Sequence, residues 1–212
     1  MNSRERTKSM AEIRKIGILG GTFNPIHHGH LLLADRAFHQ FGLDRILIMP
    51  TKNTYYKEMP KNVTQEQRLA MISLAIEDNE HFQLSLEEIN RDGVTYTYET
   101  LLDLTAKHPG CEYYFIMGAD SLYHIESWYR VEEIFSMATI VVAARGMATA
   151  SALDSQIEYI QSKYDAVIEK LYTPIMEIAS NDIRKRVKNG ESIRYLLPKK
   201  VIDYIYDNHV YE

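Results

Sequence analysis

Residues 15–30 read Lys-Ile-Gly-Ile-Leu-Gly-Gly-Thr-Phe-Asn-Pro-Ile-His-His-Gly-His. Up to Leu19 this is a short, nearly continuous apolar run, typical of a strand buried on both faces. Two glycines follow, and then a helical pattern begins. Glycine lets the backbone approach a ligand closely, and a helix N-terminus offers free N–H groups and a positive dipole end. The stretch therefore predicts a strand–loop–helix unit that binds an anion, with phosphate favoured.

His27 and His30 are three positions apart at the start of that helix, so their side chains share an edge. Two imidazoles beside an anion can donate hydrogen bonds to phosphoryl oxygens. Three histidines within four residues also suit zinc, but no cysteine or carboxylate is close in sequence. A single histidine here would be read as a surface or helix-start residue. The glycines, the helix start and the histidine pair together favour phosphate, although the spacing fits neither the G-x-G-x-x-G fingerprint nor a P-loop.

Working outward, apolar runs alternate with helical segments along the chain. The runs predict strands at Ile16–Leu19, Arg45–Met49, Phe82–Leu86, Tyr113–Met117, Thr139–Val142 and Pro174–Ile178. Gly42 is placed to end the first helix, and Thr64 with Gln67 forms a capping box for the next. Loops are expected at 52–61 and 144–151. The alternation predicts a single α/β domain over 13–212, a doubly wound, Rossmann-like parallel sheet with helices on both faces, after a flexible extension over 1–12.

The amino-acid composition and net charge exclude several classes of protein. The chain has 212 residues, 45% hydrophobic and 25% charged, which excludes a disordered or collagen-like protein. A formal charge of −5 argues against a nucleic-acid partner. No apolar run is long enough for a membrane span, and the first fifteen residues do not form a secretory signal. With a lone Cys111 as well, we expect a soluble, cytoplasmic protein without a membrane partner.

The residues 20–30 resemble the signature of the nucleotidylyltransferase superfamily, whose (Thr/His)-x-Gly-His motif matches His27–His30. Within it, the chain is most similar to the bacterial nicotinate-nucleotide adenylyltransferases. Four further matches follow in the family's order from Lys15 onward: Gln67–Met71, Thr95–Thr97 with Thr100-Leu101, Gly118–Asp120 with Trp128, and Ile183-Arg184 leading to Ser192–Leu196. A lone H-x-G-H would be weak, whereas this ordered set is specific.

The resemblance implies a reaction of NAD biosynthesis. The 5′-phosphate of nicotinate mononucleotide attacks the α-phosphorus of ATP and expels pyrophosphate, giving deamido-NAD without a covalent enzyme intermediate. Catalysis would be positioning plus charge stabilisation, with Mg²⁺ arriving on ATP. The resemblance implies catalytic roles for His27, His30 and Arg184. It also implies an ATP site at Gly20, Gly21, Thr22, Phe23, His27, His30, Lys57, Gly118, Asp120, Ser180, Asn181 and Arg184.

For the nicotinate nucleotide, the resemblance implies contacts from Gly21, Thr22, Thr97, Trp128 and Tyr129. An indole face can stack on a pyridine ring, and free N–H groups can receive its carboxylate. From the residues alone, the only tryptophan would be read as a core residue, and Asp120 as a helix cap. Lys52 and Lys61 lie near Lys57 and could replace it.

The chain departs from the family's usual Ile-Ser-Ser-Thr-x-Ile-Arg at residues 178–184, where it reads Ile-Ala-Ser-Asn-Asp-Ile-Arg. Asn181 can still cap a helix and donate to phosphate, so we expect retained activity. Asn24 stands where many members have Asp.

Two rivals stay open at this point: an adenylyltransferase for phosphopantetheine, and a nucleotide-binding module without turnover. The sequence also leaves open the preference between nicotinate and nicotinamide mononucleotide and the formation of a homo-oligomer. Met10 opens Met-Ala-Glu-Ile-Arg-Lys directly before the first strand, and we expect it to be an alternative or true initiator.

Overall fold

The protein is built on one sheet of six parallel strands. The computed structural model describes residues 14–52, 63–144, 150–174 and 176–212. The strands are β1 (Lys15–Gly21), β2 (Arg45–Pro50), β3 (Phe82–Leu84), β4 (Glu112–Gly118), β5 (Ala138–Ala144) and β6 (Ile168–Tyr172), in the spatial order β3-β2-β1-β4-β5-β6. The order reverses between β1 and β4, the place where doubly wound sheets bind ligands. The predicted fold class is confirmed.

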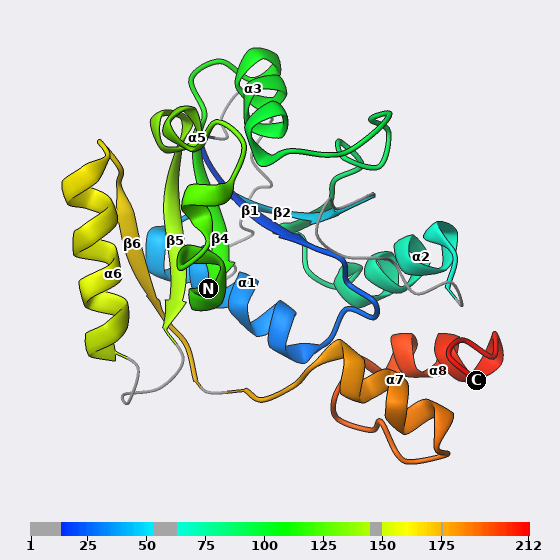
Figure 1. Ribbon diagram of the computed structural model, residues 1–212. Helices are drawn as coiled ribbons and strands as arrows, with labels where there is room; N and C mark the ends of the chain where they lie inside the picture. Colours follow the sequence, from blue (N-terminus) through cyan, green and yellow to red (C-terminus); the bar gives the residue numbers. More distant parts are fainter. Residues whose placement is uncertain (1–13, 53–62, 145–149, 175) are drawn as a thin grey trace, which may run out of the picture.

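Helices supply two apolar clusters, one on each face of the sheet. One cluster takes in α1 (His28–Phe41), α2 (Gln65–Ile76), α7 (Ser180–Lys188) and α8 (Lys199–Asp207). The other takes in α3 (Thr97–Lys107), α4 (Ala119–Leu122), η1 (Ile125–Ser127), α5 (Val131–Met137) and α6 (Ala150–Lys163). Figure 1 shows α7 and α8, in orange and red, beside the start of α1. The end of the chain thus lies near the loop that follows the first strand.

Successive side chains of the central strands alternate between these clusters. Ile16 and Ile18 belong to one and Leu19 to the other, and in β2 Ile46 and Leu47 divide in the same way. Because side chains alternate along a strand, a strand covered on both faces needs apolar residues at every position. This explains the continuous apolar runs from which β1, β2, β4 and β5 were predicted.

The predicted helix boundaries are confirmed where local chemistry sets them. Gly42 follows α1 with φ +59°, a left-handed conformation that glycine adopts without strain. Thr64 and Gln67 form the predicted capping box, in which the Gln67 N–H donates to Thr64 Oγ1 at 3.2 Å and the Thr64 N–H donates to Gln67 Oε1 at 2.9 Å.

The last predicted strand was wrong. Residues 174 and 176–178 are not in a strand, and β6 lies earlier, at Ile168–Tyr172. An edge strand is half-exposed, so β6 buries Ile168 and Leu171 but leaves Glu169 and Tyr172 in solvent. Its mixed composition hid it, whereas the apolar run after Pro174 attracted the prediction. β3 is also shorter than expected, ending at Leu84, and Leu86 is exposed.

Several predictions concern segments that the structure does not describe. The extension over 1–12, Met10 and most of the 52–61 loop lie outside the described residues. Of the expected 144–151 loop, Ala144 ends β5 and Ala150 and Ser151 already belong to α6, whereas 145–149 are not described. Among the described helices, none has the length and apolar character needed to cross a bilayer.

The capping box gives a test of the fold. Thr64→Ala removes the side-chain acceptor for an N–H at the start of α2, and we expect the free energy of unfolding to fall by about 1 kcal/mol in urea denaturation. Thr105→Ala, at an exposed position inside α3, is the matched control and should not destabilise the protein. Equal effects of the two changes would contradict the capping role.

Candidate active site

A cavity of about 640 Å³ opens at the carboxyl ends of β1 and β4. Besides the four-residue α4, three longer helices, α1, α3 and α7, begin at its wall, since His27, Tyr96 and Ala179, the residues that precede them, all line it. Helix N-termini present unpaired N–H groups and positive dipole ends. The cavity is therefore suited to ligands that carry negative charge in more than one place.

The loop that joins β1 to α1, residues 22–27, runs along the cavity. Phe23, with its side chain buried, adopts φ +45°, and its ring folds back under Gly21. A Cβ on Gly21 would lie only 3.0 Å from the Phe23 ring carbon Cζ, so a larger residue there would require the Phe23 ring to shift. Gly20, Gly21 and Thr22 line the cavity, while Phe23 supports them from below.

The two histidines of the motif lie face to face. Their ring centroids are 3.6 Å apart with the planes at 21°, and the Phe23 ring meets His30 edge-on at 5.0 Å. The His27 backbone N–H donates to His30 Nδ1 at 3.3 Å. Since Nδ1 accepts, the proton of a neutral His30 ring is assigned to Nε2, leaving Nε2–H as a donor.

The carbonyl groups of the same loop accept hydrogen bonds from side chains of α2 and α7. Thr22 O accepts from Arg68 Nη1 at 2.7 Å, Asn24 O accepts from Arg184 Nη1 at 2.7 Å, and Pro25 O accepts from Ser180 Oγ at 2.9 Å. Arg68 is 2% exposed and also binds Thr51 O at 2.9 Å. Burial lowers the pKa of its guanidinium, and the nearby Tyr211 opposes that shift. These contacts fix the loop: Arg68 binds it from outside the cavity lining, whereas Ser180 and Arg184 bind it from the cavity wall.

Asn24 is a buried polar residue of this loop, as is His27, and it lines the cavity. Its Oδ1 accepts from the Tyr211 hydroxyl at 2.5 Å, whereas its Nδ2 has no hydrogen-bond partner among the described residues. Tyr211 is 2% exposed. Burial raises the pKa of its hydroxyl, and Arg184 and Arg68 act in the opposite direction. Sequence reasoning did not find Tyr211, because nothing in the local pattern links it to Asn24.

The C-terminal motif is arranged differently from the expectation. Ala179, not Asn181, is the residue that precedes α7, and no side chain caps that helix. Asn181 Oδ1 instead accepts from Arg184 Nη2 at 3.1 Å. Ser180, Asn181 and Arg184 all line the cavity, so the predicted group is brought together. The prediction that Asn181 caps the helix was wrong, because its side chain instead orients Arg184.

At the other end of the cavity lie the residues predicted for the pyridine ring. Thr97 is the first residue of α3, and Trp128, half-buried, meets the Phe115 ring edge-on at 5.9 Å. Tyr129 is 51% exposed, with its ring centroid 5.0 Å from that of Tyr96. All of these residues line the cavity. The Trp128 side chain is thus half-buried and lines the cavity, so Trp128 is not a core residue.

Gly118 and Asp120 lie between the two ends. Gly118 ends β4 and precedes α4, so Asp120 lies within the first turn and is not the cap residue itself. Both residues line the cavity. Lys57 lies outside the described residues. With that exception, each predicted site residue lies on the cavity or, like Phe23, directly under it.

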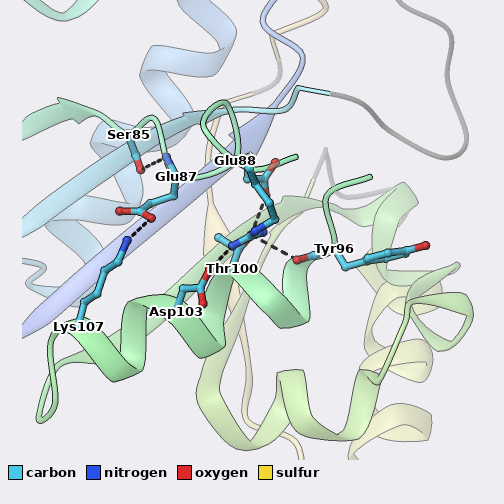
Figure 2. Close-up of polar contacts among 8 residues, drawn as sticks. Ser85, Glu87, Glu88, Tyr96, Thr100, Asp103 and Lys107 are labelled. Carbon is cyan, nitrogen blue, oxygen red and sulfur yellow. Dashed lines mark hydrogen bonds and ion pairs between the residues drawn. The ribbon is translucent and has the colours of Figure 1, made fainter. Parts of the chain in front are cut away.

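Glu88 is a further cavity residue that sequence reasoning missed. The residue is 8% exposed, and its carboxyl oxygen Oε1 accepts from Thr100 Oγ1 at 3.2 Å (Figure 2). Thr100 in turn accepts from Arg91 Nη1 at 2.8 Å and lies 3.3 Å from the Tyr96 carbonyl oxygen. Burial raises the pKa of Glu88, and hydrogen bonds from Thr100 and Thr95 together with the charge of Arg91 oppose the rise. Glu88 therefore helps to fix the start of α3.

A metal cluster of protein ligands is not found in the part of the chain that the structure describes. No group of three or more His, Cys, Asp or Glu within these ranges is arranged to hold an ion. The zinc alternative for the histidine motif thus gains no support from described residues.

Comparison with known proteins agrees with this geometry. The cytidylyltransferase-like family model matches residues 18–186. A protein of Lachnoclostridium phytofermentans, named probable nicotinate-nucleotide adenylyltransferase, is 47% identical over 199 residues, which is 94% of this chain and 100% of that protein. A protein of the same name from Lactiplantibacillus plantarum is 40% identical over 200 residues, 94% of this chain and 89% of that one.

A solved structure shows the same fold at lower identity. The nicotinic acid mononucleotide adenylyltransferase of Plasmodium falciparum, complexed with NaAD, has a TM-score of 0.75 and 22% identity, covering 93% of this chain and 97% of that one. At this identity the likeness concerns the fold alone.

The buried carboxyl gives a pH-dependent test. Because the pKa of Glu88 is raised above its usual value of 4.5, the folded protein retains a proton that the unfolded chain releases. Stability from this group is therefore present at low pH and is lost as the pH rises. Relative to Glu88→Gln, the native chain should lose free energy of unfolding as the pH rises above the usual carboxyl value of 4.5, measured by urea denaturation.

Glu158→Gln, at an exposed position on α6, is the matched control and should run parallel to the native chain across this range. A difference between native and Glu88→Gln proteins that is constant with pH would contradict the raised pKa.

Proposed function

The chain belongs to the cytidylyltransferase-like family and, within it, to the nicotinate-nucleotide adenylyltransferases, and on this premise we propose that it transfers the adenylyl group of ATP to nicotinate mononucleotide. One observation carries the proposal: three helices begin at a single cavity, on the switch point of the sheet, with the paired histidines at the first of them. Both substrates are anions, and their reacting groups are phosphates.

In this reaction an oxygen of the mononucleotide 5′-phosphate forms a bond to the α-phosphorus of ATP. The bond from that phosphorus to the oxygen bridging to the β-phosphorus breaks, and pyrophosphate leaves with its electron pair. The products are deamido-NAD and pyrophosphate, and no enzyme nucleophile takes part. Catalysis therefore rests on holding two anions in line and stabilising the charge on the leaving oxygen.

The loop and the start of α1 are proposed to hold the ATP phosphates. Gly20, Gly21 and Thr22 line the cavity with backbone, and His30 Nε2–H is the donor we assign to the transition state. His27 holds His30 in place through its backbone N–H and the stacked ring. Arg184 uses two of its nitrogens within the protein and keeps further N–H groups for the phosphates.

The other end of the cavity is proposed to recognise the nicotinate group. The first turn of α3, from Thr97, offers N–H groups for the carboxylate, and the Trp128 ring offers a face for the pyridine. Asp120, with Gly118 beside it, is proposed to accept hydrogen bonds from a ribose. Tyr129 closes the exposed rim of this end.

We assign Mg²⁺ to the ATP rather than to the protein. When bound, it would neutralise part of the charge on the triphosphate, and its ligands would be phosphate oxygens and water. Among the residues described, no group of three or more His, Cys, Asp or Glu is arranged to hold a metal ion. The location we propose for the enzyme is the cytoplasm, in line with its single cysteine.

The first experiment measures pyrophosphate release from ATP and Mg²⁺ with nicotinate mononucleotide, nicotinamide mononucleotide or phosphopantetheine as acceptor. We expect release with the nicotinate form, slower release with the amide, and none with phosphopantetheine. His30→Ala should lower kcat by about 10²–10³-fold, because it removes a donor aimed at the reacting phosphates.

His28→Ala is the matched control for that loss. His28 lies between the two motif histidines but lines a separate shallow groove with Leu31 and Asp35. Its removal should leave kcat within about twofold of the native value. Release with none of the three acceptors would overturn the proposed function and favour a binding module without turnover.

Trp128→Ala tests the pyridine end separately. Losing an aromatic stack on a base-like ring costs about 1–3 kcal/mol, so the KM for nicotinate mononucleotide should rise about tenfold while the KM for ATP stays unchanged. Tyr123→Ala, an exposed residue of the same segment outside the cavity lining, is the control. An equal rise in both KM values would show that Trp128 acts by general packing instead.

A further inference from the structure

The loop over residues 22–27 does not hold its shape alone. Its carbonyl groups are bound by Arg68 from α2 and by Ser180 and Arg184 from α7. The first N–H of α1, that of His28, donates to Leu196 O at 3.0 Å. We call residues 20–30, the loop with its two glycines and the start of α1, the phosphate cradle. Residues from the last fifth of the chain thus support this cradle, next to the start of α1 (Figure 1).

Asn24 accepts hydrogen bonds from two residues of the C-terminal segment, Arg184 and Tyr211. Its backbone oxygen receives Arg184, and its side-chain oxygen receives the Tyr211 hydroxyl, which comes from 187 positions further along the chain. With Nδ2 unpartnered among described residues, the Tyr211 bond is the side-chain contact that sets the rotation of the amide. A short buried hydrogen bond of this kind orients its acceptor strongly.

Tyr211 is itself firmly placed. Its ring belongs to the apolar cluster on this face of the sheet, its hydroxyl lies 3.9 Å from Met71 Sδ, and the neighbouring Val210 N–H donates to Ile205 O at 2.9 Å. The residue is in the left-handed region with φ +76°, so the chain turns sharply to bring the ring inward. A conformation that L-residues rarely adopt is retained only where the surroundings enforce it.

We propose that Tyr211 is a positioning residue of the active site, which acts through Asn24 to hold the phosphate cradle and Arg184 in the geometry for adenylyl transfer. The assignment rests on the proposed function, since the geometry in question is that of the ATP phosphates. Tyr211 touches no substrate in this scheme, because it does not line the cavity. Its effect reaches the reaction through the loop between β1 and α1.

A double-mutant cycle tests this coupling. Tyr211→Phe removes the hydroxyl and keeps the buried ring, Asn24→Ala removes its acceptor, and the double variant removes both. We expect Tyr211→Phe to lower kcat about three- to tenfold, the usual range for one lost hydrogen bond. The KM for nicotinate mononucleotide should change by less than about twofold, because α3 and Trp128 are not altered. In the Asn24→Ala background, Tyr211→Phe should have no further effect.

Two further variants separate positioning from stability. Tyr206→Phe removes an exposed hydroxyl from α8 and should leave kcat at the native value. Asn24→Asp keeps an acceptor for Tyr211, so adding Tyr211→Phe to it should still lower kcat. Thermal unfolding of each variant shows whether it is folded at the assay temperature.

Calorimetric binding of inorganic pyrophosphate to the same proteins supplies a readout that needs no turnover. Tyr211→Phe should raise the Kd about three- to tenfold, again only where residue 24 has an acceptor. If the native chain releases no pyrophosphate, the proposed function fails, and the binding cycle still decides the role of Tyr211. Native kcat and Kd in Tyr211→Phe, or an equal loss in both Asn24 backgrounds, would overturn the inference.

Discussion

The carbonyl groups of the loop between β1 and α1 must find hydrogen-bond donors inside the protein, and this constraint organises the molecule. Buried polar groups without partners are costly. Thr22 and Pro25 are satisfied by Arg68 and Ser180, and Asn24 by Arg184. Elements distant in sequence therefore converge on a loop of a few residues. The cradle belongs as much to α2 and α7 as to the β1–α1 unit that contains the motif.

The sequence was informative where structure follows from local chemistry. Continuous apolar runs located β1, β2, β4 and β5 because those strands are covered on both faces. Gly42 and Thr64 marked helix boundaries because left-handed backbone and a capping oxygen are local requirements. The prediction failed at β6, where the two buried residues, Ile168 and Leu171, are separated by the exposed Glu169 and the half-buried Lys170, so that no continuous apolar run forms.

The residues of the site also differ in whether a local sequence pattern could predict them. The histidines and glycines occupy adjacent positions, so the motif alone located the cradle, and the family resemblance added Trp128 and Arg184. Glu88 and Tyr211 carry no local signal, since their partners lie 12 and 187 positions away. Asn181 was assigned to the wrong partner for a related reason: the helix boundary at Ala179 is set by how α7 meets the loop. Residues defined by tertiary contacts need the structure.

The contacts that close the loop span 155, 160 and 187 positions of sequence. During synthesis the segment that bears the histidines leaves the ribosome early, while Ser180, Arg184 and Tyr211 follow only near the end of translation. These three side chains can therefore hold the loop between β1 and α1 only after the last helices of the chain have been made. A chain that ends before Ser180 lacks all three contacts, so the shape of this loop depends on completion of the fold.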